Sequence, residues 1–101
     1  MAIKLCTSQD GVFAYLLGDI DHHAAKEMRE SIDSAVERIQ AKNLTLDFSD
    51  VQFMDSSGIG LIMGRYKLIK SYGGKLMIAN TSERIRKMIH FAGIDKLIKI
   101  D

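Results

Sequence analysis

The hydrophobic pattern of this 101-residue chain changes its period several times, and these changes constrain the fold more than any other feature does. Beyond Asp21, apolar residues recur at spacings of three and four, which predicts an amphipathic helix with the stripe Ala25, Met28, Ile32, Ala35 and Ile39. The period then falls to two, because Leu44, Leu46 and Phe48 alternate with polar residues. That alternation is typical of a strand with one buried face, and it places the intervening Asp47 on the other face.

Two more helices are predicted in the second half of the chain. The first follows Asp55 and ends at residues 71–74, and its apolar stripe is Ile59, Ile62, Tyr66 and Ile69. The second is capped by Thr81 or Ser82 and ends at Gly93, and its apolar residues are Ile85, Met88, Ile89 and Ala92.

Short apolar runs predict the other strands, at residues 3–6, 12–17, 75–79 and 97–100. The first two flank the tight-turn signal Asp10-Gly11, so we expect them to form an antiparallel hairpin. The order β-β-α-β-α-β-α-β predicts an α/β fold with a mixed, mainly parallel sheet and amphipathic helices packed on it. Because no proline-rich or Gly/Ser-rich linker divides the chain, residues 1–101 are expected to form one domain.

Composition narrows the classes of function. Lys and Arg are interspersed with Asp and Glu and leave a net charge of +1, which provides no basic surface for nucleic acid or anionic lipid. The single cysteine, Cys6, has no internal disulfide partner and favours a reducing compartment. The first residues lack the apolar region of a signal peptide, and the longest apolar stretch, 57–64, is far shorter than the roughly 20 residues of a membrane span. We therefore expect a small cytoplasmic domain without nucleic-acid or membrane partners.

The segment Phe53-Met54-Asp55-Ser56-Ser57-Gly58-Ile59-Gly60 joins a predicted strand to the second helix, where open α/β sheets place their sites. A hydroxyl at Ser56 is explained by ordinary helix capping, but capping does not explain two serines and two glycines after an acidic residue. Phosphorylation of Ser56 is the functional alternative. It adds about −1.5 to −2 charges where the helix N-terminus favours an anion.

Three other kinds of site fit the sequence less well. Adjacent histidines in Asp21-His22-His23 point about 100° apart on a helix, which disfavours joint chelation of a metal. The spacing of Gly58, Gly60 and Gly64 misses the dinucleotide fingerprint by one residue, and close packing of the helix on the sheet explains these glycines better. The serine segment is not a hydrolase elbow, and the C-terminal basic residues lack the interleaved aromatic residues of a nucleic-acid surface.

Two segments carry a resemblance to a known family. Residues 18–23, Gly-Asp-Ile-Asp-His-His, and residues 53–67, which begin Phe-Met-Asp-Ser-Ser-Gly-Ile-Gly, resemble the anti-sigma factor antagonists of the STAS domain family, and most of all the sporulation type. The resemblance extends over nearly the whole chain. The D-S-[ST]-G-[LIV]-G core is fairly specific for these antagonists, and the Asp-His-His and Gly-Arg-Tyr-Lys segments indicate the sporulation type.

The resemblance implies a partner-switching cycle without catalysis by this chain and without a cofactor or metal. The unphosphorylated form binds an anti-sigma factor that is also a serine kinase, and thereby releases a sigma factor. The kinase phosphorylates Ser56, the phosphorylated form is released, and a serine phosphatase resets it. The residues expected to contact the partner are Asp21, Asp55, Ser57, Gly58, Ile59 and Met63.

Two expectations qualify the resemblance. Family members usually continue into a C-terminal helix, whereas this sequence stops at Asp101, so that helix is expected to be absent or replaced by something outside the chain.

The same fold also serves as an interaction module for other regulatory partners, such as a stress-response kinase or a transporter. A small hydrolase or nucleotide-binding enzyme that uses Ser56 or the Asp21-His22-His23 cluster is the alternative from a different class.

Overall fold

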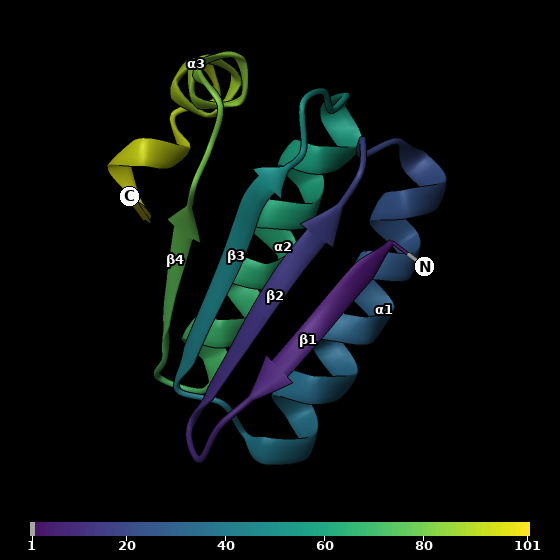
Figure 1. Ribbon diagram of the computed structural model, residues 1–101. Coiled ribbons are helices and arrows are strands. Elements are labelled where there is room, and N and C mark those ends of the chain that lie inside the picture. Colours follow the sequence, from purple (N-terminus) through teal and green to yellow (C-terminus); the bar gives the residue numbers. More distant parts are fainter. Residues whose placement is uncertain (1) are drawn as a thin grey trace.

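The computed structural model describes residues 2–101 and contains one five-stranded sheet with helices (Figure 1). Its elements follow one another in nearly the predicted order. They are β1 (Ile3–Thr7), β2 (Gly11–Leu17), α1 (His22–Ile39), β3 (Asn43–Asp50), α2 (Ser56–Ser71), β4 (Lys75–Ala79), α3 (Glu83–Phe91), the 3₁₀ helix η1 (Ile94–Lys96) and β5 (Lys99–Ile100).

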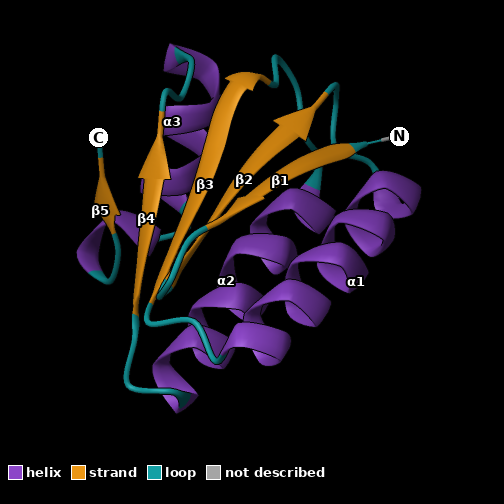
Figure 2. Cartoon of the chain, turned by 60° about the horizontal axis from the view of Figure 1, so that its bottom comes forward, coloured by secondary structure: helices purple, strands orange, loops and turns teal. Residues whose placement is uncertain are grey.

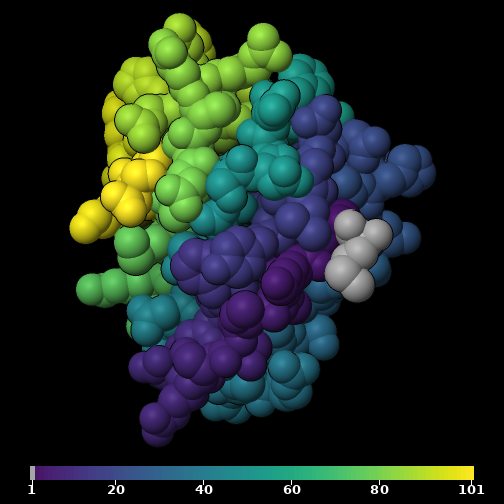
Figure 3. Space-filling model, in the orientation of Figure 1, coloured from purple at the N-terminus to yellow at the C-terminus, as the bar shows by residue number. Residues whose placement is uncertain are grey.

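The sheet has the strand order β1-β2-β3-β4-β5 and is mixed. β1 runs antiparallel to β2, whereas β2, β3, β4 and β5 pair in parallel. The prediction of an α/β fold with an opening hairpin and a mainly parallel sheet is therefore confirmed. α1 and α2 lie side by side on one face of the sheet (Figure 2), and α3 lies beyond the carboxyl end of β4 (Figure 1). On the opposite face, strands β1 to β4 are at the molecular surface (Figure 3).

The main core lies between this sheet and the helices α1 and α2. Most of the predicted stripe of α1 is buried, although Val36 is buried in place of the half-buried Ile39. Leu44, Leu46 and Phe48 of β3 are at most 1% exposed, so this strand has the predicted buried face. No helix among residues 2–101 has the length and hydrophobicity that a membrane span requires.

Asp47 lies on the face away from α1 and α2, where the alternation places it, but it is nevertheless only 3% exposed. Its Oδ1 accepts hydrogen bonds from the Ser49 N–H at 2.9 Å and the Ser49 hydroxyl at 2.6 Å, and its Oδ2 accepts one from the Asn80 amide at 2.7 Å. Burial acts to raise the pKa of Asp47, but the hydrogen bonds together outweigh it and lower the pKa below 3.8. The carboxylate therefore links the end of β3 to the turn that follows β4.

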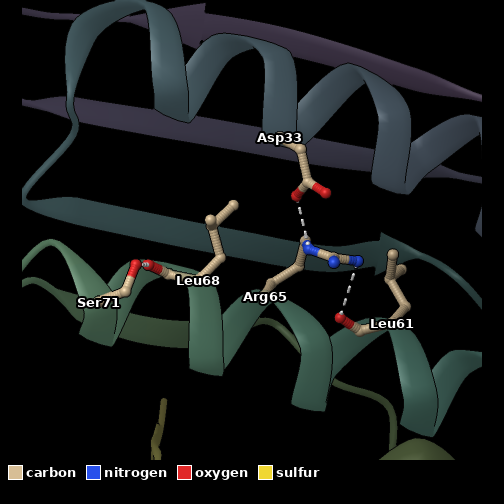
Figure 4. A network of polar contacts seen from close by, with 5 residues as sticks. All are labelled: Asp33, Leu61, Arg65, Leu68 and Ser71. Carbon is tan, nitrogen blue, oxygen red and sulfur yellow. Dashed lines mark hydrogen bonds and ion pairs between the residues drawn. The ribbon is translucent and has the colours of Figure 1, made fainter.

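The buried stripe of α2 also differs from its prediction, because it is rotated around the helix toward Leu61 and Arg65. Its buried residues are Gly58, Leu61, Ile62, Arg65 and Ile69, whereas the predicted Ile59 and Tyr66 are half-buried. Arg65 reaches toward α1, where its Nε lies 2.8 Å from Oδ1 of Asp33 (Figure 4). The two atoms are close but not aligned as a hydrogen bond, so the contact is an ion pair between the helices.

The C-terminal part is less regular than predicted. α3 is capped by Ser82, and Gly93 at φ 76° reverses the chain after it, but Ala92 is exposed rather than packed. The predicted strand 97–100 is reduced to Lys99–Ile100, because Leu97 and Ile98 form the turn after the 3₁₀ helix η1 and donate their N–H groups to the Ile94 carbonyl. Within residues 2–101 no helix follows β5.

Replacing Asp47 tests its role in linking the end of β3 to the turn that follows β4. We expect Asp47→Ala to lower the free energy of unfolding by about 1–3 kcal/mol at pH 7, because three donors lose their acceptor. The matched control is Glu30→Ala, whose carboxylate is exposed and makes no side-chain contact of this kind among residues 2–101. Because the pKa of Asp47 is lowered, its contribution should be complete above pH 3.8 and fall as the pH drops through the folded pKa. Urea unfolding of both variants between pH 2 and 7 measures this, and equal losses in both would contradict the role.

Candidate functional site

The loops before α1 and α2 are joined by backbone pairing. Ile20 and Met54 form an isolated parallel bridge. The Ile20 N–H donates to the Phe53 carbonyl at 3.1 Å, and the Asp55 N–H donates to the Ile20 carbonyl at 3.1 Å. The Asp19 carboxylate also accepts from the Phe53 N–H at 3.2 Å. These bonds hold the first turns of the two helices next to each other at the carboxyl ends of β2 and β3.

An aspartate caps each of these two helices. Asp21 accepts a hydrogen bond from the Ala24 N–H at 2.8 Å, as the sequence predicts, and Asp55 accepts one from the Ser57 N–H at 2.8 Å. The Ala24 hydrogen bond is the main cause that lowers the pKa of Asp21 below its ordinary value, against a smaller opposing effect of burial. Both residues are exposed, so the site presents two capping carboxylates to solvent.

Ser56 is the first residue of α2, and its side chain is exposed. The cap of this helix is Asp55, so the hydroxyl of Ser56 is not needed for capping. In this first turn the N–H groups of Ser57 and Gly58 donate to Asp55, and the positive end of the helix dipole favours a negatively charged group on Ser56. The structure thus places an accessible hydroxyl at the helix terminus, between the two joined loops and solvent.

The other residues expected to contact a partner differ in exposure. Ser57, Ile59 and Met63 are half-buried, and their side chains extend the surface from Ser56 along α2. Gly58 is buried against the side chain of Met54. A Cβ at this position would lie 2.5 Å from Sδ of Met54, which is too close for any residue other than glycine unless Met54 shifts. Gly58 therefore offers no surface of its own and instead allows α2 to pack closely against the loop.

Phe53 was not predicted as a site residue, but its side chain is 50% exposed directly before the buried Met54. The pair of adjacent apolar residues was a usable signal, because two neighbours in an extended segment point to opposite sides. An exposed phenylalanine three residues before Ser56 adds an apolar contact group to the surface.

Close packing was expected to explain Gly58, Gly60 and Gly64, but the structure supports it at only one of these three positions. Close packing accounts for Gly58, but a Cβ added at Gly60 or Gly64 would meet nothing within 4 Å. His22 and His23 begin α1 with ring centroids 5.9 Å apart. Among residues 2–101, no group of three His, Cys, Asp or Glu side chains is arranged to hold a metal ion.

Comparison with known proteins identifies relatives of the whole fold. The family described as the STAS domain matches residues 5–101. An anti-sigma F factor antagonist from Paenibacillus polymyxa is 36% identical over 85 residues, which cover 84% of this chain and 73% of that protein. An anti-sigma-B factor antagonist from Bacillus subtilis is 31% identical over 93 residues, covering 92% of this chain and 84% of that protein.

Solved structures agree with these sequence relatives. The anti-sigma factor antagonist SpoIIAA in its unphosphorylated form has a TM-score of 0.80 and 29% identity, over 99% of this chain and 87% of that one. The phosphorylated form of the Bacillus cell fate determinant SpoIIAA has a TM-score of 0.79 and 30% identity, over 99% of this chain and 91% of that one. The chain therefore belongs to the STAS domain family, and its relatives there are anti-sigma factor antagonists.

Proposed function

We propose that this chain is an anti-anti-sigma factor that is switched by phosphorylation of Ser56. In the unphosphorylated form it binds an anti-sigma factor and so releases a sporulation sigma factor. The observation that carries this proposal is the exposed Ser56 hydroxyl at the first turn of α2, held beside Asp21 by the pairing of the two loops. The relatives named as anti-sigma F factor antagonists and the phosphorylated form of SpoIIAA support it.

In this proposal the anti-sigma factor is also the kinase, and the chain is its substrate rather than an enzyme. The Ser56 hydroxyl oxygen attacks the γ-phosphorus of ATP, the bond to the β–γ bridging oxygen breaks, and ADP leaves. The hydroxyl proton passes to a base on the kinase. A serine phosphatase later restores the hydroxyl by directing water onto the phosphorus, which releases inorganic phosphate. Both reactions use substrates that the cytoplasm supplies, namely ATP and water. Neither requires a cofactor bound to this chain.

The phosphate acts through its charge at the contact surface. The first turn of α2 tolerates an anion, so the fold itself should survive the modification. The same group follows the capping carboxylate of Asp55, on a surface that also exposes Phe53 and part of Ile59. Burying a doubly charged phosphate there without a partner costs several kcal/mol. Even about 3 kcal/mol weakens binding more than a hundredfold.

The second candidate is the same switch with a stress-response kinase as partner. The 31% identity to the anti-sigma-B factor antagonist of Bacillus subtilis favours it. The two candidates share Ser56 and the surface around it and differ in the anti-sigma factor recognised. Parallel assays with an anti-sigma F factor and an anti-sigma-B factor distinguish them.

Intact mass after incubation with ATP and an anti-sigma F factor tests the proposed reaction. We expect wild type to gain one phosphate and Ser56→Ala to gain none, because only Ser56 combines exposure with the first position of α2. The matched control is Ser57→Ala, which removes the neighbouring half-buried hydroxyl and should still gain one phosphate.

Each other result has a definite meaning. A phosphate on Ser56→Ala but not on Ser57→Ala would move the modified residue to Ser57. If no variant is modified by the anti-sigma F factor but wild type is modified by the anti-sigma-B factor, the second candidate replaces the first. If neither kinase modifies wild type, the proposed switch is wrong.

A further inference from the structure

A groove of about 420 Å³ lies between the first half of α1 and the first half of α2. Its lining comes from both helices: His22, Ala25, Lys26, Arg29, Ser57, Gly60, Leu61, Gly64 and Arg65. Because Ser57 belongs to the lining, the groove adjoins the surface around Ser56. It is therefore continuous with the candidate site but extends along the helices, away from the joined loops.

The charged side chains that line the groove are all basic, and one of them, Arg65, is paired with Asp33 outside the lining. Lys26, Arg29 and Arg65 line it together with His22, and no Asp or Glu belongs to the lining. Neither Lys26 nor Arg29 forms an ion pair with any of residues 2–101. Since the whole chain has a net charge of only +1, this is a local concentration of positive charge rather than a general excess.

Arg65 adds a buried donor to the groove. Its side chain is only 8% exposed, and its guanidinium lies between the two helices (Figure 4). Nε faces Asp33, and Nη1 donates to the Leu61 carbonyl at 3.4 Å, which is long for a hydrogen bond. An arginine has five N–H donors, and among residues 2–101 only the Leu61 carbonyl accepts a hydrogen bond from this side chain. Burial lowers the pKa of Arg65, and Asp33 opposes this only in part.

Gly60 and Gly64 lie on the α2 side of the groove and have no explanation within the chain. Neither has a positive φ, and a Cβ at either position would meet nothing within 4 Å. Glycine inside a helix is less stable than alanine because it loses more backbone entropy on folding. The absence of two side chains leaves the backbone of α2 open to close approach by another molecule.

We propose that this groove receives an acidic segment of the anti-sigma factor that binds the unphosphorylated chain, an inference that rests on the proposed function. The segment's backbone lies against Gly60 and Gly64, and its carboxylates pair with Lys26, Arg29 and the free N–H groups of Arg65. The opening over two glycines favours a polypeptide, because a polypeptide uses the length of the groove whereas a small anion needs only the charged end. The groove thus supplies attraction that is independent of the Ser56 hydroxyl.

Charge reversal in the groove tests the electrostatic part. We expect Lys26→Glu/Arg29→Glu to weaken binding to an anti-sigma F factor by at least about tenfold, because two attractive charges become repulsive. The matched control is Arg84→Glu/Arg86→Glu, two exposed charges on α3 outside the groove, with an expected change of less than about twofold. Isothermal titration gives both affinities, and thermal unfolding confirms that the variants are folded.

The outcomes separate the two proposals. If wild type binds and the groove variant binds equally well, the groove is not the docking site and the proposed function stands. If wild type does not bind, the proposed function fails. Whether the groove binds an acidic segment is then tested separately, by titrating ¹⁵N-labelled wild type with a hexaglutamate peptide and, in a second titration, with inorganic phosphate. Shifts of the Gly60 and Gly64 amides with the peptide support an acidic segment. Shifts with phosphate alone, or with neither, overturn it.

Gly64→Ala tests the close approach. We expect this variant to raise the melting temperature of the free chain, because alanine is the better helix former and its Cβ meets nothing. The same variant should weaken binding by at least about tenfold, because the methyl group occupies the path of the partner's backbone. Lys67→Ala, an exposed substitution on α2 outside the groove lining, is the control and should leave the affinity unchanged. If Gly64→Ala binds as tightly as wild type, no backbone lies against this glycine.

Discussion

The candidate site depends on the parallel pairing of Ile20 with Met54. This pairing lies beyond the ends of β2 and β3 and brings the starts of two helices together although they are far apart in sequence. The hydrogen bonds between the two loops then fix where Asp21, Asp55 and Ser56 lie relative to one another. Without them, α1 and α2 would still pack on the sheet through their apolar residues, but the two capped ends would have no fixed spacing. The site is therefore a property of the loops more than of the core.

Electrostatics divides the surface into two parts with different tasks. At the joined loops, two aspartates use their carboxylates to cap helices and Asp19 accepts from Phe53, so a phosphate on Ser56 adds a further negative group to that end of the molecule. Along the helices the groove is basic, and its buried Arg65 is held in place by Asp33. In the account proposed here, the basic groove attracts the partner while the phosphate makes the adjoining contact unfavourable. Such a switch needs no rearrangement of the sheet or the helices.

Local sequence patterns were sufficient to predict the order of elements, the cap at Asp21 and the position of Ser56 at a helix start. They failed where distant residues decide the environment. The charge of the buried Asp47 is stabilised in part by a hydrogen bond from Asn80, which comes from another part of the chain. The burial of Arg65 depends on packing against Asp33 of α1, which the periodicity of α2 alone does not encode. The groove was not predicted for the same reason, since each helix contributes only part of its lining.

The central claim is that one phosphate on Ser56 weakens binding to the anti-sigma factor strongly while the fold persists. Its most direct test is the dissociation constant of the chain from one anti-sigma F factor, measured before and after stoichiometric phosphorylation at Ser56. The account predicts that phosphorylation weakens binding by at least about a hundredfold, in line with the cost of burying an unpaired phosphate. Affinities that agree within about threefold, a difference of less than 1 kcal/mol, would contradict it.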